Sequence, residues 1–393
     1  MMFNNIELSS VITDIAAGPF GSNLKVSCFV PYGFPIIDGA NLKGFKVTDN
    51  LTKFVTEEKA RSLGRSIARR GDVVVTISGT LGQIAYIPND SMFEEYLCSQ
   101  RQFRISLDTS RVYVPYLVFY FHTNEGQSKI LAFENQTGVP ALSQPLKNFR
   151  KIRIQLPRYD ERRRIASVIE SINDKIECNQ KLNDNLEQQA KSLYEEMFLN
   201  NPDADMVSGT LSDIATITMG QSPSGSSYNE DSVGEVFYQG RAEFGFRFPT
   251  RRLFTTEPKR MAEPGDVLLS VRAPVGDLNV AYEKCCIGRG LGAIHSKTGD
   301  SSFMLYTMFA LKPQLDVFNG EGTVFGSINR DGLSNLPVNI PSAEEIAKFE
   351  AVVRPMDNLI RANYEEICRL QSTRDSLLPK LMSGEIDVSD IQL

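Results

Sequence analysis

The sequence is poor in the residues that usually build enzymatic centres. It contains two histidines, His122 and His295, in dissimilar segments, and six cysteines without metal-binding spacing. The cysteines are also too sparse for a disulfide-stapled secreted domain, so thiols in a reducing compartment are expected. We therefore predict no metal site and no catalytic histidine.

Features that direct a chain to a membrane are lacking as well. The first ten residues have neither a basic nor an apolar region of the kind found in signal peptides. The longest strongly apolar run, residues 114–121, is far too short to span a bilayer. We expect a cytoplasmic protein without a membrane partner.

Motifs of nucleotide and nucleic-acid catalysis are incomplete. The segment GQSPSGSS at Gly220 has glycines at P-loop spacing, but the lysine that should follow is absent. No Asn-Pro-Pro-aromatic segment of adenine methyltransferases occurs, and residues 257–259 form a Glu-x-Lys without an acidic partner in strand context. These absences favour a binding or scaffolding subunit without catalytic residues over an enzyme.

The distribution of charge along the chain is more informative about binding partners than the net charge. The formal net charge is −6, which gives no support for a nonspecific phosphate binder, yet residues 1–156 carry a net charge of +4. Within this part, one face of a predicted helix that Thr56 could cap carries Lys59, Arg61, Arg65, Arg69 and Arg70. Such a face is either simply solvated or a stripe that contacts phosphates.

The most informative positive feature is an internal repeat. Residues 154–198 resemble residues 338–382 without a gap, at an offset of 184. Upstream, GDVVVTISGTLG matches GDVLLSVRAPVG at an offset of 194, and CSQRQFRI matches CIGRGLGA at 188, which aligns Arg101 with Arg289. Insertions therefore fall in loops of the first part of each copy, whereas the last part reads as an uninterrupted helix.

Both helices carry apolar residues at 3-4 heptad spacing, which predicts a coiled-coil seam. If a two-fold axis relates the two helices, the numbers of facing residues add up to the same sum along the whole pair. Setting Asn183 opposite Asn363 fixes this sum and places the axis near the middle of each helix. We expect the side-chain amides of Asn183 and Asn363 to form a hydrogen bond with each other. The alternative is that both asparagines point to solvent or to a partner protein. The predicted helix-pairing residues are Ile169, Ile172, Ile176, Asn179, Asn183, Leu186, Leu193, Val353, Met356, Ile360, Asn363, Ile367, Leu370 and Leu377.

The runs 73–77 and 267–271, each entered by Gly-Asp, are predicted strands. The expected fold is α/β (α+β): two globular domains and two long helices packed as an antiparallel coiled coil, with an internal pseudo-two-fold repeat. The expected segments are residues 1–156 (first domain), 157–200 (central helix), 201–340 (second domain) and 341–393 (C-terminal helix and tail).

Several polar residues beside glycines or in basic clusters suit base edges and phosphates, although turn formation and ion pairing are open alternatives. The predicted DNA-binding residues are Lys43, Arg61, Arg65, Arg69, Arg70, Ser78, Thr80, Arg101, Gln221, Ser222, Ser224, Gln239, Arg241, Arg247, Arg272 and Arg289.

The repeat of a variable globular part followed by a similar helix, with FYQGRAEFGFRFP and CCIGRGL in the second copy, resembles the DNA-specificity subunits of type I restriction–modification systems. IQLPRYDERRRI departs from the usual Pro-Pro-x-x-Glu-Gln pattern, because Arg158 and Arg162 replace its second Pro and its Gln.

The resemblance implies that each globular part is a target recognition domain that reads one half of a bipartite, asymmetric DNA sequence. It also implies that the helices set the gap between half-sites and dock two methyltransferase subunits and, through them, restriction subunits. S-adenosylmethionine, ATP and Mg would belong to those partners, and this chain would hold no cofactor. The alternatives are a coiled-coil scaffold for protein partners without DNA readout, and a nuclease or methyltransferase that acts alone.

Overall fold

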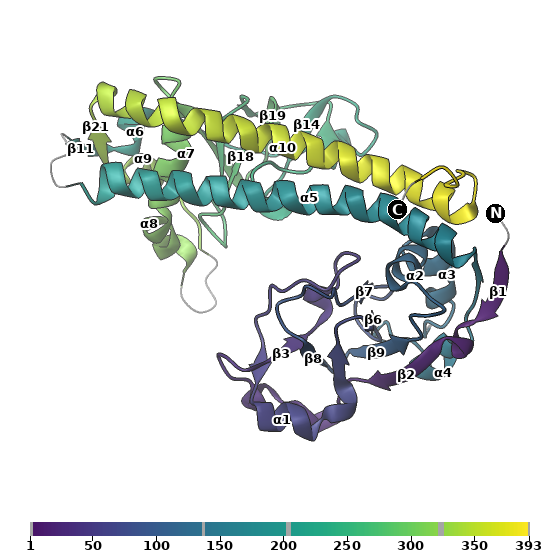
Figure 1. The fold of residues 1–393 in the computed structure, drawn as a ribbon. Coiled ribbons are helices and arrows are strands. Elements are labelled where there is room, and N and C mark those ends of the chain that lie inside the picture. The colour runs from purple at the N-terminus through teal and green to yellow at the C-terminus, as the bar shows by residue number, and fades with distance from the viewer. Residues whose placement is uncertain (1–2, 136–137, 202–205, 321–325, 392–393) are drawn as a thin grey trace. The chain divides into compact units, whose positions relative to one another are not determined.

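The computed structural model describes residues 3–135, 138–201, 206–320 and 326–391. The chain divides into two compact units. Unit 1 comprises residues 1–177 and 368–393, and unit 2 comprises residues 178–367. Each unit therefore combines one globular part with a portion of both long helices (Figure 1).

Unit 1 contains two four-stranded sheets, ordered β2-β9-β6-β7 and β4-β3-β8-β5, and the ribbon β1-β10. Only β3 and β8 run parallel among its named pairs. The strands are β1 Asn4–Glu7, β2 Ile12–Ala17, β3 Phe34–Ile37, β4 Phe54–Val55, β5 Ile67–Arg69, β6 Val73–Thr76, β7 Ile84–Tyr86, β8 Glu95–Cys98, β9 Gln102–Leu107 and β10 Arg153–Leu156. The short helices are α1 Glu57–Ser62, α2 Val114–Phe121, α3 Asn124–Leu131 and α4 Pro145–Arg150.

Unit 2 repeats this plan with the sheets β12-β20-β17-β18 and β13-β15-β14-β19-β16 and the ribbon β11-β21. Its strands are β11 Met206–Thr210, β12 Ala215–Met219, β13 Tyr228–Asn229, β14 Glu235–Tyr238, β15 Leu253–Thr255, β16 Met261–Ala262, β17 Val267–Ser270, β18 Leu278–Val280, β19 Cys285–Ile287, β20 Leu291–Ser296 and β21 Pro337–Pro341. Its short helices are α6 Leu211–Ile214, α7 Ser301–Ala310, α8 Lys312–Asp316 and α9 Arg330–Ser334.

The two predicted strands and the repeat are confirmed. β6 and β17 are fully buried, as expected for apolar runs that are covered on both faces. β6 pairs with β7 and β9, and β17 pairs in the same sense with β18 and β20. The parallel pair β3-β8 likewise has its counterpart in β14-β19. The predicted mixed fold is therefore confirmed in both copies.

Two long helices follow the globular parts. α5 spans Tyr159–Tyr194 and continues in a π-helical turn over Glu195–Leu199, and α10 spans Ala343–Ser383. Within each unit the two helix portions lie side by side (Figure 1). Every one of the fourteen predicted helix-pairing residues is buried or half-buried.

The two helix portions run antiparallel within each unit (Figure 1), and in unit 2 the bonded residues have numbers that rise in one helix and fall in the other. In unit 1, Arg374 Nη1 donates to Asn173 Oδ1 at 3.1 Å. In unit 2, Asn363 Nδ2 donates to Asn183 Oδ1 at 2.8 Å, and Asn179 Nδ2 donates to Glu366 Oε2 at 2.7 Å. The structure thus brings Asn183 and Asn363 together as a polar layer in an apolar seam.

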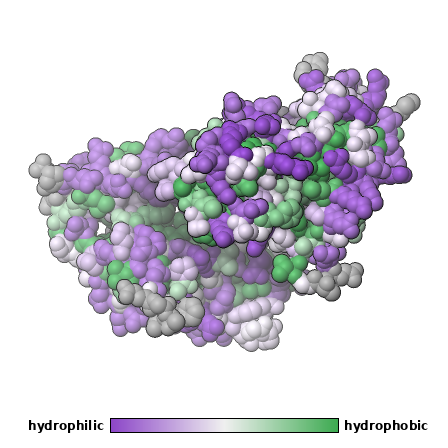
Figure 2. Space-filling view, turned by 90° about the horizontal axis from the view of Figure 1, so that it is seen from below, coloured by the Kyte–Doolittle hydropathy of each residue, from purple (hydrophilic) through white to green (hydrophobic). Residues whose placement is uncertain are grey.

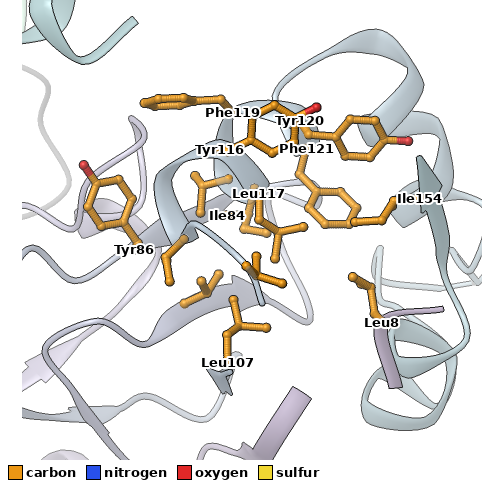
Figure 3. Close-up of a cluster of buried hydrophobic side chains, with 14 of the residues drawn as sticks. Leu8, Ile84, Tyr86, Leu107, Tyr116, Leu117, Phe119, Tyr120, Phe121 and Ile154 are labelled. Atoms are coloured by element: carbon orange, nitrogen blue, oxygen red, sulfur yellow. The ribbon is translucent and has the colours of Figure 1, made fainter. Parts of the chain in front are cut away.

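The core of unit 1 collects side chains from distant parts of the chain. Figure 3 shows aromatic residues of α2, among them Phe121, in one cluster with Leu8, Ile84 and Ile154. The same cluster includes Ile169 of α5 and Leu378, Leu381, Met382 and Val388 from the C-terminal portion. The core of unit 2 is equivalent, and Tyr194 and Phe198 pack there on Phe303 and Phe349.

The displayed surface is mostly hydrophilic with smaller apolar areas between (Figure 2). Within the described ranges, no helix is both long enough and apolar enough to cross a bilayer.

Candidate nucleic-acid interface

Four predicted DNA-binding residues of unit 1 converge on one open pocket of about 820 Å³, which we call polar site 1. It is lined by Lys43 in the segment after β3, by Ser78 and Thr80 in the segment after β6, and by Arg101 between β8 and β9. Arg101 is exposed and forms no ion pair within the described part of the chain. Its guanidinium is thus available to an anionic or hydrogen-bond-accepting ligand.

The floor of polar site 1 is held in place by hydrogen bonds. Gln83 Nε2 donates to the Gly39 carbonyl at 3.0 Å and its Oε1 accepts from Thr76 at 3.0 Å. Asp38 accepts from Lys53 at 2.6 Å and from the Ala40 amide at 2.9 Å. Burial raises the pKa of Asp38, but Lys53 and the Ala40 amide outweigh burial, so its pKa is lowered and the carboxylate stays charged.

In unit 2 the equivalent place, polar site 2, is built around Gln239. Its side-chain amide exchanges hydrogen bonds with Ser222 Oγ at 2.9 and 3.0 Å, and Ser222 Oγ also accepts from the Arg289 amide at 3.2 Å. The Gln221 and Arg289 side chains are exposed. Polar site 2 therefore brings together four predicted residues: Gln221, Ser222, Gln239 and Arg289.

Glycines allow the segments of each site to approach closely. A Cβ on Gly220 would lie 2.1 Å from the Gly288 carbonyl oxygen, and a Cβ on Gly18 would lie 1.8 Å from the Ser99 carbonyl oxygen. A Cβ on Gly288 would also meet Gln239 at 2.8 Å. A residue with a Cβ at these positions would force the two segments of each site apart.

The predicted alignment of Arg101 with Arg289 is wrong by one residue. The amide of Ile77 donates to the carbonyl of Arg101, whereas the equivalent amide of Val271 donates to the carbonyl of Gly290. The backbone offset at this turn is therefore 189 and not 188, and Arg289 corresponds to Gln100. The two sites share a backbone frame but present different side chains at equivalent positions.

The basic stripe of unit 1 does not lie on one helix face. Thr56 caps α1 as predicted, with a 3.2 Å bond from the Lys59 amide, but the helix ends at Ser62. Arg65 follows in a 3-10 turn and Arg69 in β5. The early end arises because Gly64 follows, a residue that disfavours helix.

Carboxylates neutralise part of this stripe. Arg61 and Arg69 both pair with Glu95. Burial raises the pKa of Glu95, but the two arginines lower it by more, so the pKa lies below its usual value. Arg70 lies 3.7 Å from Glu94. Arg65 is exposed and forms no ion pair in the described part of the chain, so among the four arginines of the stripe it is the one without a carboxylate partner.

Four predicted residues of unit 2 lie outside polar site 2. Arg241 pairs with Asp277, Ser224 bonds Ser226, and Arg272 is exposed in an isolated bridge to Ser327. Arg247 is only 4% exposed and bonds acidic residues of both long helices, so it has no surface for DNA. The prediction that Arg247 binds DNA is therefore wrong.

Sequence reasoning missed several residues that complete polar site 1. Gln83, Gln100 and Gln102 line it and were not predicted. Two of them flank Arg101 in the segment CSQRQ, so the polar neighbours of a predicted arginine were a usable signal. The fixed hydrogen bonds of Gln83 depend on strand pairing that the sequence alone does not reveal.

Amide, hydroxyl, guanidinium and carboxylate groups meet in both sites. Such groups match the donors and acceptors on base edges and phosphates. In the ranges that the structure describes, no three His, Cys, Asp or Glu residues are placed to hold a metal ion.

Comparison with known proteins gives the same division into two copies. The family model described as "Type I restriction modification DNA specificity domain" matches residues 30–188 and again residues 204–367. A putative type I restriction enzyme MjaX specificity subunit from Methanocaldococcus jannaschii is 26% identical over 91% of this chain and 88% of its own length. The MjaIX specificity subunit of the same organism is 22% identical over 86% and 82%.

Among solved structures, the S subunit of a type I restriction–modification system from M. genitalium aligns over 97% of this chain and 96% of its own, with a TM-score of 0.58 and 16% identity. At that identity the similarity concerns the fold. The two family matches cover most of the sequence and fall on the two structural repeats, each with its polar site. This chain belongs to the type I restriction–modification DNA-specificity family, whose function is the recognition of DNA sequence.

Proposed function

We propose that this chain reads a bipartite, asymmetric DNA target, one half with polar site 1 and the other with polar site 2. The observation that carries this proposal is the shared backbone frame of the two sites, which holds Asp38 and Arg101 in one copy and Gln239 and Arg289 in the other. A common frame with different side chains reads two different half-sites, because base discrimination depends on donor and acceptor patterns.

The subunit itself carries out no catalysis in this proposal. Its long helices set the gap between half-sites and dock two methyltransferase subunits and, through these, restriction subunits. S-adenosylmethionine, ATP and Mg are bound by those partners. The S subunits named above support this arrangement, since they are components of type I systems.

The direct test is to map methylated adenines in a host that carries this chain with its methyltransferase. A single motif with two defined halves and a fixed gap supports the proposal. Methylation with no motif, or at an uninterrupted motif, contradicts it.

A protein scaffold without DNA readout is the second candidate, favoured by the net charge of −6 and by the glutamates that neutralise the arginine stripe. Pulldown with double-stranded DNA in the presence of the methyltransferase subunit separates the two. Failure to retain DNA of any sequence favours the scaffold.

A further inference from the structure

Arg247 connects three helices of unit 2. Its guanidinium donates to Asp357 of α10 at 2.8 Å, to Glu187 of α5 at 3.0 Å and to the hydroxyl of Tyr306 in α7 at 3.3 Å. Tyr306 in turn donates to Asp357 at 3.0 Å. The Arg247 side chain is 4% exposed, and the two carboxylates are 14% and 18% exposed, so this network is largely shielded from water.

Such a network favours one geometry over near alternatives. A buried guanidinium needs its carboxylate partners to offset its desolvation, and the planar fork accepts few arrangements of them. A shift of either helix portion against the loop that holds Arg247 would leave a charge buried without its partner. The network therefore penalises small displacements that an apolar contact would tolerate.

The backbone of Arg247 is tied to the sheet that supports polar site 2. The Val280 amide donates to the Arg247 carbonyl at 2.9 Å, and Asn279 Nδ2 donates to the Gly245 carbonyl at 2.9 Å. Asn279 and Val280 both belong to β18, which pairs with β17. The neighbouring Phe248 packs its ring on Tyr282 and on Tyr364 of α10. The loop thus joins the sheet to both helix portions.

We propose that Arg247 is a positioning residue for DNA recognition: it fixes polar site 2 against the helix portions of unit 2 and thereby sets the gap at which the second half-site is accepted. This inference rests on the proposed function above. It assigns to one buried arginine a role in gap selection that is separate from any contact with DNA.

Unit 1 offers an internal comparison. The Tyr86 amide donates to the Phe45 carbonyl as the Val280 amide does to the Arg247 carbonyl, so Arg247 takes the backbone place of Phe45. The basic residue of the corresponding loop in unit 1 is Lys46, one residue later. Lys46 also bonds the helix, at 2.8 Å from Asp174 and 3.2 Å from Glu177, but both partners lie on α5 and its side chain is 26% exposed. A lysine ammonium lacks the planar fork of arginine, so it restricts geometry less. The restraint is therefore expected to be stricter in unit 2.

The experiment uses the full chain assembled with its methyltransferase, and a DNA library in which both half-sites are fixed and the gap varies by single base pairs. Arg247→Met removes the guanidinium at the centre of the network, and Glu187→Gln removes the charge of one partner while leaving Asp357 in place. Arg251→Met is the matched control, since Arg251 is an exposed arginine of the same loop that pairs with Glu283.

Wild type and Arg251→Met should methylate one gap length. Glu187→Gln should raise methylation at neighbouring gaps about tenfold relative to the native gap, the factor expected when a hydrogen bond between two charged groups becomes one to a neutral acceptor. Arg247→Met, which loses the bonds to Asp357, Glu187 and Tyr306, should raise it at least as much. The half-site sequences and the salt dependence of DNA binding should stay as in wild type, because Arg247 faces no phosphate.

An unchanged gap preference in Glu187→Gln would overturn the inference while leaving the proposed function intact. A reduced salt slope in Arg247→Met would also overturn it, since that would indicate a lost phosphate contact. Failure of the proposed function looks different, because wild type itself would then show no bipartite motif.

Discussion

At the scale of single residues, steric demand separates the glycines that build the recognition frame from those that do not. Gly220 sits where a Cβ would collide with a backbone carbonyl, whereas Gly225 has no atom within 4 Å of such a Cβ. We predict that Gly220→Ala lowers the free energy of unfolding by about 1–3 kcal/mol through overpacking and impairs the half-site read by unit 2. Denaturant titration checks this, and Gly225→Ala should be near wild type. Equal stability of the two variants would contradict the steric argument.

His122 gives unit 1 a pH dependence whose sign can be worked out. Burial lowers the pKa of His122, although its Nε2 lies 2.8 Å from the Ile84 carbonyl, and Arg374 lowers the pKa further. The ring is neutral in the folded state, so its contribution to stability is complete above the unfolded pKa of about 6.5 and is lost as the pH falls through the lower folded value.

His122→Gln, which keeps a donor for the Ile84 carbonyl, should therefore lose less stability than wild type between pH 7 and pH 5. Melting temperatures measured across that range provide the check. Curves that run parallel for the two proteins would show that His122 does not titrate in this window.

The sequence predicted which residues lie in the two polar sites better than it predicted what each residue does. The polar residues beside glycines in both copies were found from sequence, and most of them lie in the two sites. The role of Arg247 was predicted wrongly, because in the sequence an arginine near a glycine looks the same whether it faces solvent or two half-buried carboxylates. Its partners Glu187 and Asp357 are 60 and 110 residues away, a distance in sequence that no local pattern spans.

At the scale of elements, the polar layer of the helix pair makes a testable distinction between single and double substitution. Asn183→Leu alone leaves Asn363 buried without its partner and should destabilise by about 1–3 kcal/mol. Asn183→Leu with Asn363→Leu should raise the melting temperature, yet widen the range of half-site gaps that the complex accepts, because register loses its polar restraint. Single variants as stable as wild type, with an unaltered gap, would exclude this role.

The arginine stripe gives a second prediction at this scale. If it contacts phosphates, Arg65→Gln should reduce the slope of log affinity against log salt by about 0.9, the value for one lost contact. Arg69→Gln should change the slope less, because Glu95 already compensates its charge. Binding measured over a salt series tests both, and unaltered slopes in both variants would show that the stripe is merely solvated.

Elements with long periodic patterns were predictable, and so were the short apolar strands β6 and β17, whereas the short helix α1 was not. The heptad spacing and the ungapped repeat located both long helices, since dozens of residues report on one period. α1 was overextended because charged residues continue past Ser62, and charge alone does not distinguish a helix face from a turn followed by a strand.

At the scale of the whole molecule, the two copies should behave as separable readers. Replacing residues 205–340 with the corresponding part of a relative should change one half of the methylated motif and leave the other half intact, because polar site 1 contains no residue of that range. Methylation sequencing of the chimera provides the readout. A change in both halves would contradict the modular arrangement.

The two units also differ in how they are distributed along the chain, with a consequence for biosynthesis. Unit 2 is one continuous stretch, whereas the core of unit 1 includes Leu378, Leu381, Met382 and Val388, more than 200 residues after its last N-terminal strand. A ribosome therefore delivers all of unit 2 before unit 1 has its full core. A stop codon shortly after residue 367 would damage the reader encoded at the start of the gene and spare the one encoded next to the lesion.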